Sequence, residues 1–134
     1  MSERFLKWAI RRHFHALGFN VRLGRIRLGN TEVDGEVEGQ GWKMALEIKT
    51  AGDDLTRGLG QLAEALVFGY RACALVTTLR KAKRVDRTVF DRLGLVLLGV
   101  DSKGNIHQVY PTYARIGQAS PPDFDSPEET AQSS

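Results

Sequence analysis

The spacing of apolar residues changes character along the first 50 residues. Within residues 3–17 they recur every three or four positions, which predicts an amphipathic helix. Residues 19–28, 31–38 and 42–50 alternate apolar and polar side chains instead, a pattern typical of strands. Short Gly-Asn and Gln-Gly pairs predict turns between these strands, and Gly24 predicts a bulge in the first. The region therefore predicts a helix followed by a three-stranded antiparallel meander.

The next segment predicts a second helix that packs on the sheet. Asp53 or Asp54 can cap its start, and its apolar stripe continues to about Phe68. Gly58 and Gly60 are poor helix formers, so we expect the regular helix to begin only near Gly60. These glycines can allow close packing of the helix on the sheet, or the approach of a DNA backbone.

The remaining pattern alternates strands with a helix. Residues 72–78 are apolar without alternation, which predicts a strand buried on both faces. A helix over 84–93 and strands over 95–100 and 106–110 follow. The fold class predicted is α/β, with a mixed central sheet flanked by helices in an αβββαβ order.

Length and composition favour one cytoplasmic domain. The chain has 134 residues, and we expect residues 1–117 to form a single domain. Residues 118–134 carry four acidic and no basic side chains with several Pro and Ser, which predicts a disordered tail. No run of 18 apolar residues or signal-peptide pattern occurs, so we expect no membrane span. Cys73 is the only cysteine, which excludes an intramolecular disulfide.

The net charge of +3 is unevenly distributed. Residues 1–28 carry seven basic and one acidic side chain, and residues 65–117 carry nine and three. Residues 29–64 between them carry three basic and eight acidic side chains. The basic segments suit a phosphate backbone, although solvated surface charge would give the same composition.

The acidic centre contains the candidate chemistry. Strict alternation along residues 31–38 places four carboxylates, Asp34 among them, on one face of a strand. Glu47 and Lys49 can lie beside Asp34 on the neighbouring antiparallel strand. Paired carboxylates repel one another unless a cation such as Mg²⁺ lies between them. This hypothesis leaves Glu36 as an additional candidate ligand.

A second interpretation needs no chemistry. The carboxylates from Glu32 to Glu38 would form the solvated face of an antiparallel sheet, with Lys43 and Lys49 as cross-strand partners. The two interpretations differ in whether these carboxylates are buried.

Asp34, twelve further residues and then Glu47-Ile48-Lys49 resemble the PD-(D/E)XK, or restriction-endonuclease-like, nuclease superfamily. Within it the chain is similar to archaeal Holliday-junction resolvases and small crenarchaeal nuclease-like proteins. Val33 stands where the motif's name has Pro. The resemblance implies a Mg²⁺ site, with Mn²⁺ able to substitute, whose metal positions are Asp34, Glu47 and Ile48. The catalytic residues that it implies are Asp34, Glu47, Lys49, Gln61 on the second helix and Glu3 on the first helix.

The resemblance also implies a function, a partner and an assembly. We expect a Mg²⁺-dependent DNA endonuclease, with branched or damaged DNA as the first substrates to consider. Because one small domain offers one active centre, cutting both strands predicts a homodimer. The alternative is a catalytically inactive DNA-binding or assembly protein of the same fold.

A basic run follows the buried strand over 72–78 and is a candidate for holding the DNA backbone. It opens the predicted third helix, where the helix N-terminus and the nearby cations suit a phosphate. A solvated loop is the alternative. The candidate DNA-binding residues are Arg80, Lys81, Lys83 and Arg84.

Overall fold

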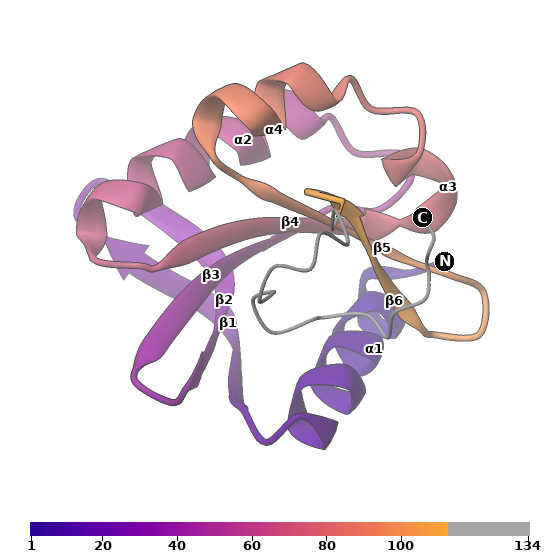
Figure 1. The fold of residues 1–134 in the computed structure, drawn as a ribbon, viewed down its shortest axis with the longest axis horizontal. Coiled ribbons are helices and arrows are strands. Elements are labelled where there is room, and N and C mark those ends of the chain that lie inside the picture. Colours follow the sequence, from indigo (N-terminus) through magenta and orange to yellow (C-terminus); the bar gives the residue numbers. More distant parts are fainter. Residues whose placement is uncertain (113–134) are drawn as a thin grey trace.

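The computed structural model describes residues 1–112, and the chain order of its elements confirms the predicted αβββαβ core (Figure 1). The elements are α1 (Glu3–Ala16), β1 (Asn20–Leu28), β2 (Thr31–Gly39), β3 (Trp42–Ile48), α2 (Leu55–Ala65), η1 (Leu66–Phe68), β4 (Ala72–Thr78), α3 (Leu79–Ala82), α4 (Arg87–Leu93), β5 (Val96–Val100) and β6 (Ile106–Tyr110). The predicted tail, 118–134, and the last positions of the predicted domain, 113–117, lie outside the described residues.

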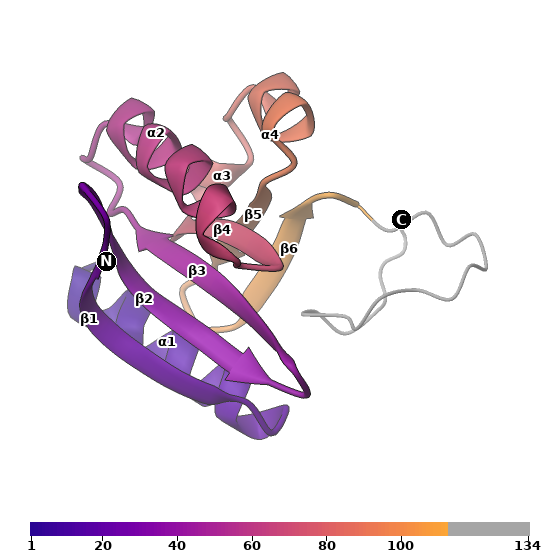
Figure 2. The ribbon, with the colours of Figure 1, turned by 90° about the vertical axis from the view of Figure 1, so that its left-hand side faces the viewer.

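All six strands form one mixed sheet, in the order β1-β2-β3-β4-β5-β6. The first three strands are an antiparallel meander, β4 and β5 continue parallel to β3, and β6 is antiparallel to β5. In Figure 2, α1 lies against one face of this sheet, while α2, α3 and α4 cover the other. The predicted mixed central sheet flanked by helices is therefore confirmed.

Each face of the sheet has its own hydrophobic core. Side chains of α1 and alternate residues of β3 are buried in the first core: Leu6, Ile10, Phe14, Met44, Leu46 and Ile48. Side chains of α2, α3 and α4 meet the opposite face in the second core: Leu62, Ala82 and Phe90, against Ala45 and Leu75. Each large side chain buried in this way contributes about 1.5–3 kcal/mol. Because β3 alternates strictly, Glu47 faces the second core and its helices.

The prediction that side chains alternate strictly between the two faces along β2 is wrong. Val33 packs in the second core and Val37 in the first, although the two are four residues apart. The predicted bulge lies beside this change, because the register of β1 against β2 shifts between Leu23 and Ile26. The carboxylates of β2 consequently have different surroundings rather than one shared face.

Three predicted boundaries are also wrong. The second helix begins at Leu55, where the Asp54 side chain accepts a hydrogen bond from the backbone N–H of Thr56, so the cap outweighs the two glycines. The strand predicted over 42–50 ends at Ile48. The helix predicted over 84–93 begins only at Arg87, after Asp86 caps it, and a separate short helix, α3, precedes it at Leu79–Ala82.

The helices of residues 1–112 are all too short or too polar to cross a membrane.

Candidate active site

Asp34 is held beside the end of β3 by the local change in strand pairing. The β2–β3 ladder ends at the pair Gly35 and Leu46. One step further, the Asp34 carboxylate accepts a hydrogen bond from the backbone N–H of Ile48 at 2.8 Å. The next N–H, that of Lys49, donates in the opposite direction to the Val76 carbonyl on β4 at 2.9 Å. The Asp34 side chain therefore accepts the Ile48 N–H in place of a backbone carbonyl of β2. This hydrogen bond holds the carboxylate beside residues 47–49.

Glu47 brings a second carboxylate to the same place, and it is buried. Its side chain is only 3% exposed, and its Oε2 lies 3.9 Å from the Lys49 Nζ. Its Oε1 is buried and accepts no hydrogen bond within the described part of the chain. A buried carboxylate oxygen without a partner is costly in its charged form, so this atom is available to bind a cation.

The surroundings of Glu47 disfavour its charged form. Burial is the largest cause, and the neighbouring Asp34 carboxylate adds to it, while the Lys49 ammonium opposes both. Together they raise the pKa of Glu47 from 4.5 to about 8. A carboxyl in this state gains most from a cation placed beside it.

These groups fit a divalent cation. Mg²⁺ in phosphoryl chemistry often takes one or two carboxylates, with water and substrate phosphate as its remaining ligands. No group of three metal-ligating side chains occurs within residues 1–112, so Asp34 and Glu47 would be the charged ligands. Ile48 could contribute only its backbone carbonyl. The unpartnered Oε1 of Glu47 is the observation that supports the fit.

Gly58 lets α2 lie directly on these residues. A Cβ at Gly58 would lie 2.8 Å from the Cε of Lys49 and 3.1 Å from the Cγ of Glu47. A Cβ at Gly60 would meet nothing within 4 Å. The predicted close packing is confirmed at Gly58 and wrong at Gly60.

Gln61 and Glu3, the other implied catalytic residues, have different positions. Gln61 lies one turn beyond Gly58 on α2, and its Nε2 donates to the Glu32 carbonyl on β2 at 3.1 Å. It therefore ties the helix to the strand that carries Asp34. Glu3 lies in the first turn of α1, where its carboxylate forms an ion pair with Lys7 at 3.1 Å. A catalytic contribution of Glu3 stays a prediction.

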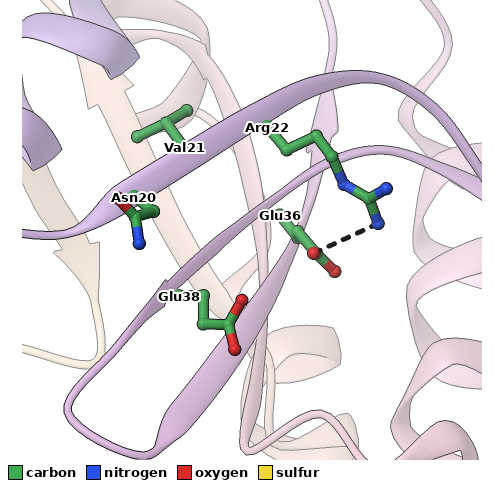
Figure 3. Close-up of a pocket in the computed structure, with 5 residues that line it drawn as sticks. All are labelled: Asn20, Val21, Arg22, Glu36 and Glu38. Carbon is green, nitrogen blue, oxygen red and sulfur yellow. Dashed lines mark hydrogen bonds and ion pairs between the residues drawn. The ribbon is translucent and has the colours of Figure 1, made fainter.

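Glu36, the additional candidate ligand, is occupied elsewhere. One carboxylate oxygen accepts from the Tyr70 hydroxyl at 2.8 Å, and the other pairs with Arg22 at 3.2 Å. Burial and this bond raise the pKa of Tyr70, which keeps the phenol protonated as the donor. Glu36 and Arg22 also line a pocket of about 310 Å³, together with Glu38 and two residues of β1. Figure 3 shows the Arg22 side chain reaching Glu36 from the neighbouring strand. Burial of Glu36 also contradicts a fully solvated acidic face from Glu32 to Glu38.

The basic run separates into two kinds of residue. Arg80, Lys83 and Arg84 are exposed in α3 and the turn that follows it. Lys81 is partly buried, and its ammonium donates to backbone carbonyls of the loop after Lys49. The run does not open α4, whose N-terminus is capped by Asp86.

Thr77 was not among the predicted site residues. Its hydroxyl is fully buried on β4 and has no hydrogen-bond partner within the described residues. Ile48 and Val76 are partners in the parallel β3–β4 pair, so Thr77 lies one step on, level with Lys49. The sequence signal that could have indicated Thr77 is its position as a polar residue at the end of a strand that is buried on both faces.

Raising the pH should destabilise the metal-free protein. The Glu47 pKa is about 8 in the folded chain and near 4.5 when unfolded, so the folded state retains a proton that the unfolded state loses. The contribution of Glu47 to the free energy of unfolding is therefore fully present below pH 4.5. It falls by up to ~1.4 kcal/mol per pH unit as the pH rises toward 8. Urea unfolding in EDTA at pH 5.5, 6.5 and 7.5 measures this fall.

Glu47→Gln isolates the contribution of Glu47 to that slope. The variant should show a flatter dependence on pH, while Glu38→Gln, which changes an exposed carboxylate of β2, should follow wild type. Mn²⁺ should stabilise wild type more at pH 7.5 than at pH 5.5. A wild-type slope equal to that of Glu47→Gln would contradict the raised pKa.

No protein-family model and no curated protein matches the sequence. Two solved structures share the fold: a XisH family protein from Nostoc punctiforme, and an FdxN element excision controlling factor protein from Anabaena variabilis. Each has a TM-score of 0.61 and 18% sequence identity, over 78% of this chain and 97% of its own. At this identity the likeness establishes the fold alone. The narrower resemblance to archaeal resolvases stays a prediction.

Proposed function

We propose that this chain is a metal-dependent nuclease that hydrolyses phosphodiester bonds in DNA. The observation that carries the proposal is the buried Glu47 carboxylate, which has one unpartnered oxygen and lies against Asp34. The large majority of buried side-chain polar atoms in folded proteins have a hydrogen-bond partner, so an unpartnered buried oxygen is unusual in a purely structural ion pair. Asp34 and Glu47 would hold Mg²⁺ or Mn²⁺, and the neighbouring Lys49 would act on the reacting groups.

The reaction is a hydrolysis. The oxygen of a water molecule forms a bond to phosphorus, the bond from phosphorus to one sugar oxygen breaks, and that oxygen takes up a proton. A bound divalent cation supplies Lewis-acid polarisation of the phosphate and a more acidic water. The Lys49 ammonium is held at 3.9 Å from Glu47, where it can orient the water and stabilise charge on the phosphate. Gly58 and Gln61 keep α2 against this group.

The DNA backbone would lie on the exposed cations of α3 and its following turn. Arg80, Lys83 and Arg84 project from the segment that follows β4, and they are exposed. Such contacts position a nucleic acid without reading its sequence. Cleavage of both strands would require two copies of the chain.

The description of one fold neighbour, which refers to excision of an element, is compatible with a DNA-related role. The alternative of an inactive DNA-binding or assembly protein would leave Glu47 as an unexplained cost to folding. The presence of Asp34, Glu47 and Lys49 together therefore favours activity.

A cleavage assay tests the proposal. The purified chain is incubated with end-labelled linear, flapped and four-way DNA, in Mg²⁺, in Mn²⁺ and in EDTA. Product ends should appear with either metal and disappear in EDTA. Failure to cut any of the three substrates at micromolar protein would reject the nuclease and leave the binding alternative.

A further inference from the structure

The loop that joins β3 to α2 is organised around one ammonium group. Lys81 Nζ donates to the carbonyls of Thr50 at 3.2 Å and Ala51 at 2.9 Å, and also to the carbonyl of Asp53. An ammonium has three N–H donors, so these three carbonyls use all of them. Lys81 and its acceptors are 28 to 31 residues apart in the sequence.

The same loop begins immediately after Lys49. The Asp53 carboxylate accepts from the Thr50 N–H at 2.7 Å and from its hydroxyl at 3.0 Å, which closes a tight turn. This turn leaves carbonyl oxygens directed to one side, where Lys81 binds them. The end of β3 is thus tied to β4 through the Lys49 N–H and to α3 through Lys81.

The geometry points to Lys81 as a positioning residue for Lys49 and Glu47 rather than a contact to DNA. This inference rests on the proposed nuclease function. With all three donors engaged, Lys81 has none left for a phosphate. The helix that carries Lys81 is itself fixed, because the Thr78 hydroxyl accepts from the Lys81 N–H at 3.2 Å. A fixed cation can thus hold a loop whose residues 51–54 are exposed.

Lys81→Ala should lower kcat about tenfold and leave KM near wild type, because supporting residues of this kind typically contribute 10–100-fold. The dependence of DNA affinity on salt should be unchanged, whereas loss of a phosphate contact would flatten the slope by about 0.9. Lys83→Ala is the contrasting variant, because it removes the same charge two residues away, at an exposed position proposed to contact the phosphates, so it should flatten the salt slope and raise KM. A flattened slope with a raised KM in Lys81→Ala would overturn the inference.

Added amines give a second readout. Methylammonium can enter the space left by the side chain and donate to the three carbonyls, so it should restore part of the Lys81→Ala rate. Tetramethylammonium has no N–H donor and should restore nothing. Equal effects of the two salts would contradict a role of the ammonium in organising the loop.

Hydrogen exchange separates this inference from the proposed function. The Thr50 and Asp53 N–H groups are bonded within the turn and should exchange at least about tenfold faster in Lys81→Ala, but not in Lys83→Ala. If wild type cleaves no DNA while this difference appears, the nuclease proposal fails, and the anchoring of the loop by Lys81 is still supported. If wild type is active and these N–H groups exchange at the same rate in Lys81→Ala, only the role of Lys81 in holding the loop is rejected.

Discussion

Asp34→Asn and Glu47→Gln are each expected to lower the cleavage rate at least ~100-fold while DNA affinity stays the same or increases. Changes to groups that merely support metal ligands cost 10–100-fold, and loss of a charged ligand should cost more. Affinity for DNA comes mainly from Lys and Arg side chains that contact the phosphates, so these substitutions should not weaken it. Removing a negative charge beside the DNA also reduces repulsion.

The amide variants are chosen because the structure indicates that both will fold. The side-chain oxygen of Asn can still accept the Ile48 N–H that Asp34 binds. Gln resembles the neutral carboxyl that burial favours at Glu47. Thermal unfolding at pH 6.5 should therefore give melting temperatures close to wild type, so that a lost rate cannot be ascribed to unfolding.

Glu38→Gln is the matched control, because it neutralises an exposed carboxylate on the same strand as Asp34. Its rate should equal that of wild type in single-turnover assays on labelled DNA. If Asp34→Asn cleaves as fast as Glu38→Gln, the carboxylates of β2 and β3 are not the metal ligands.

The part of the candidate site that the sequence predicts depends on short-range geometry. The Gln40-Gly41 turn pairs Gly39 with Trp42, and counting back along both strands brings Asp34 level with Glu47. Alternation along β3 then separates its apolar side from the side of Glu47. Strand period and turn length suffice for both predictions.

The missed features depend on contacts between distant segments. Glu36 is bound by Tyr70, 34 residues away, and that partner has no local signal. Lys81 is one of several similar cations in the sequence, and only the fold brings it to the loop after Lys49. The change of face between Val33 and Val37 accompanies a bulge in the neighbouring strand, and the alternation of β2 by itself does not reveal it.

The two glycines of α2 illustrate the same limit, and they provide the second large prediction. Both are equally poor helix formers by propensity, and either Gly→Ala change should add up to ~1 kcal/mol of helix stability. Their surroundings differ, because only a Cβ at Gly58 meets the side chains of Lys49 and Glu47. Which glycine faces the sheet is set by the rotation of α2, in which Gly58 lies four residues before the buried Leu62, and helix propensity does not report that rotation.

Gly58→Ala should therefore lower kcat about 10–100-fold, since displacement of reacting groups by about 1 Å can cost 10²-fold. The added methyl must push the Lys49 side chain, or the whole helix, away from the candidate metal ligands. Gly60→Ala makes the same chemical change two residues further along and should keep the wild-type rate with equal or greater thermal stability. Single-turnover rates and melting temperatures of both variants test this pair. A Gly58→Ala enzyme as fast as Gly60→Ala would show that the packing of α2 on Lys49 does not control the chemistry.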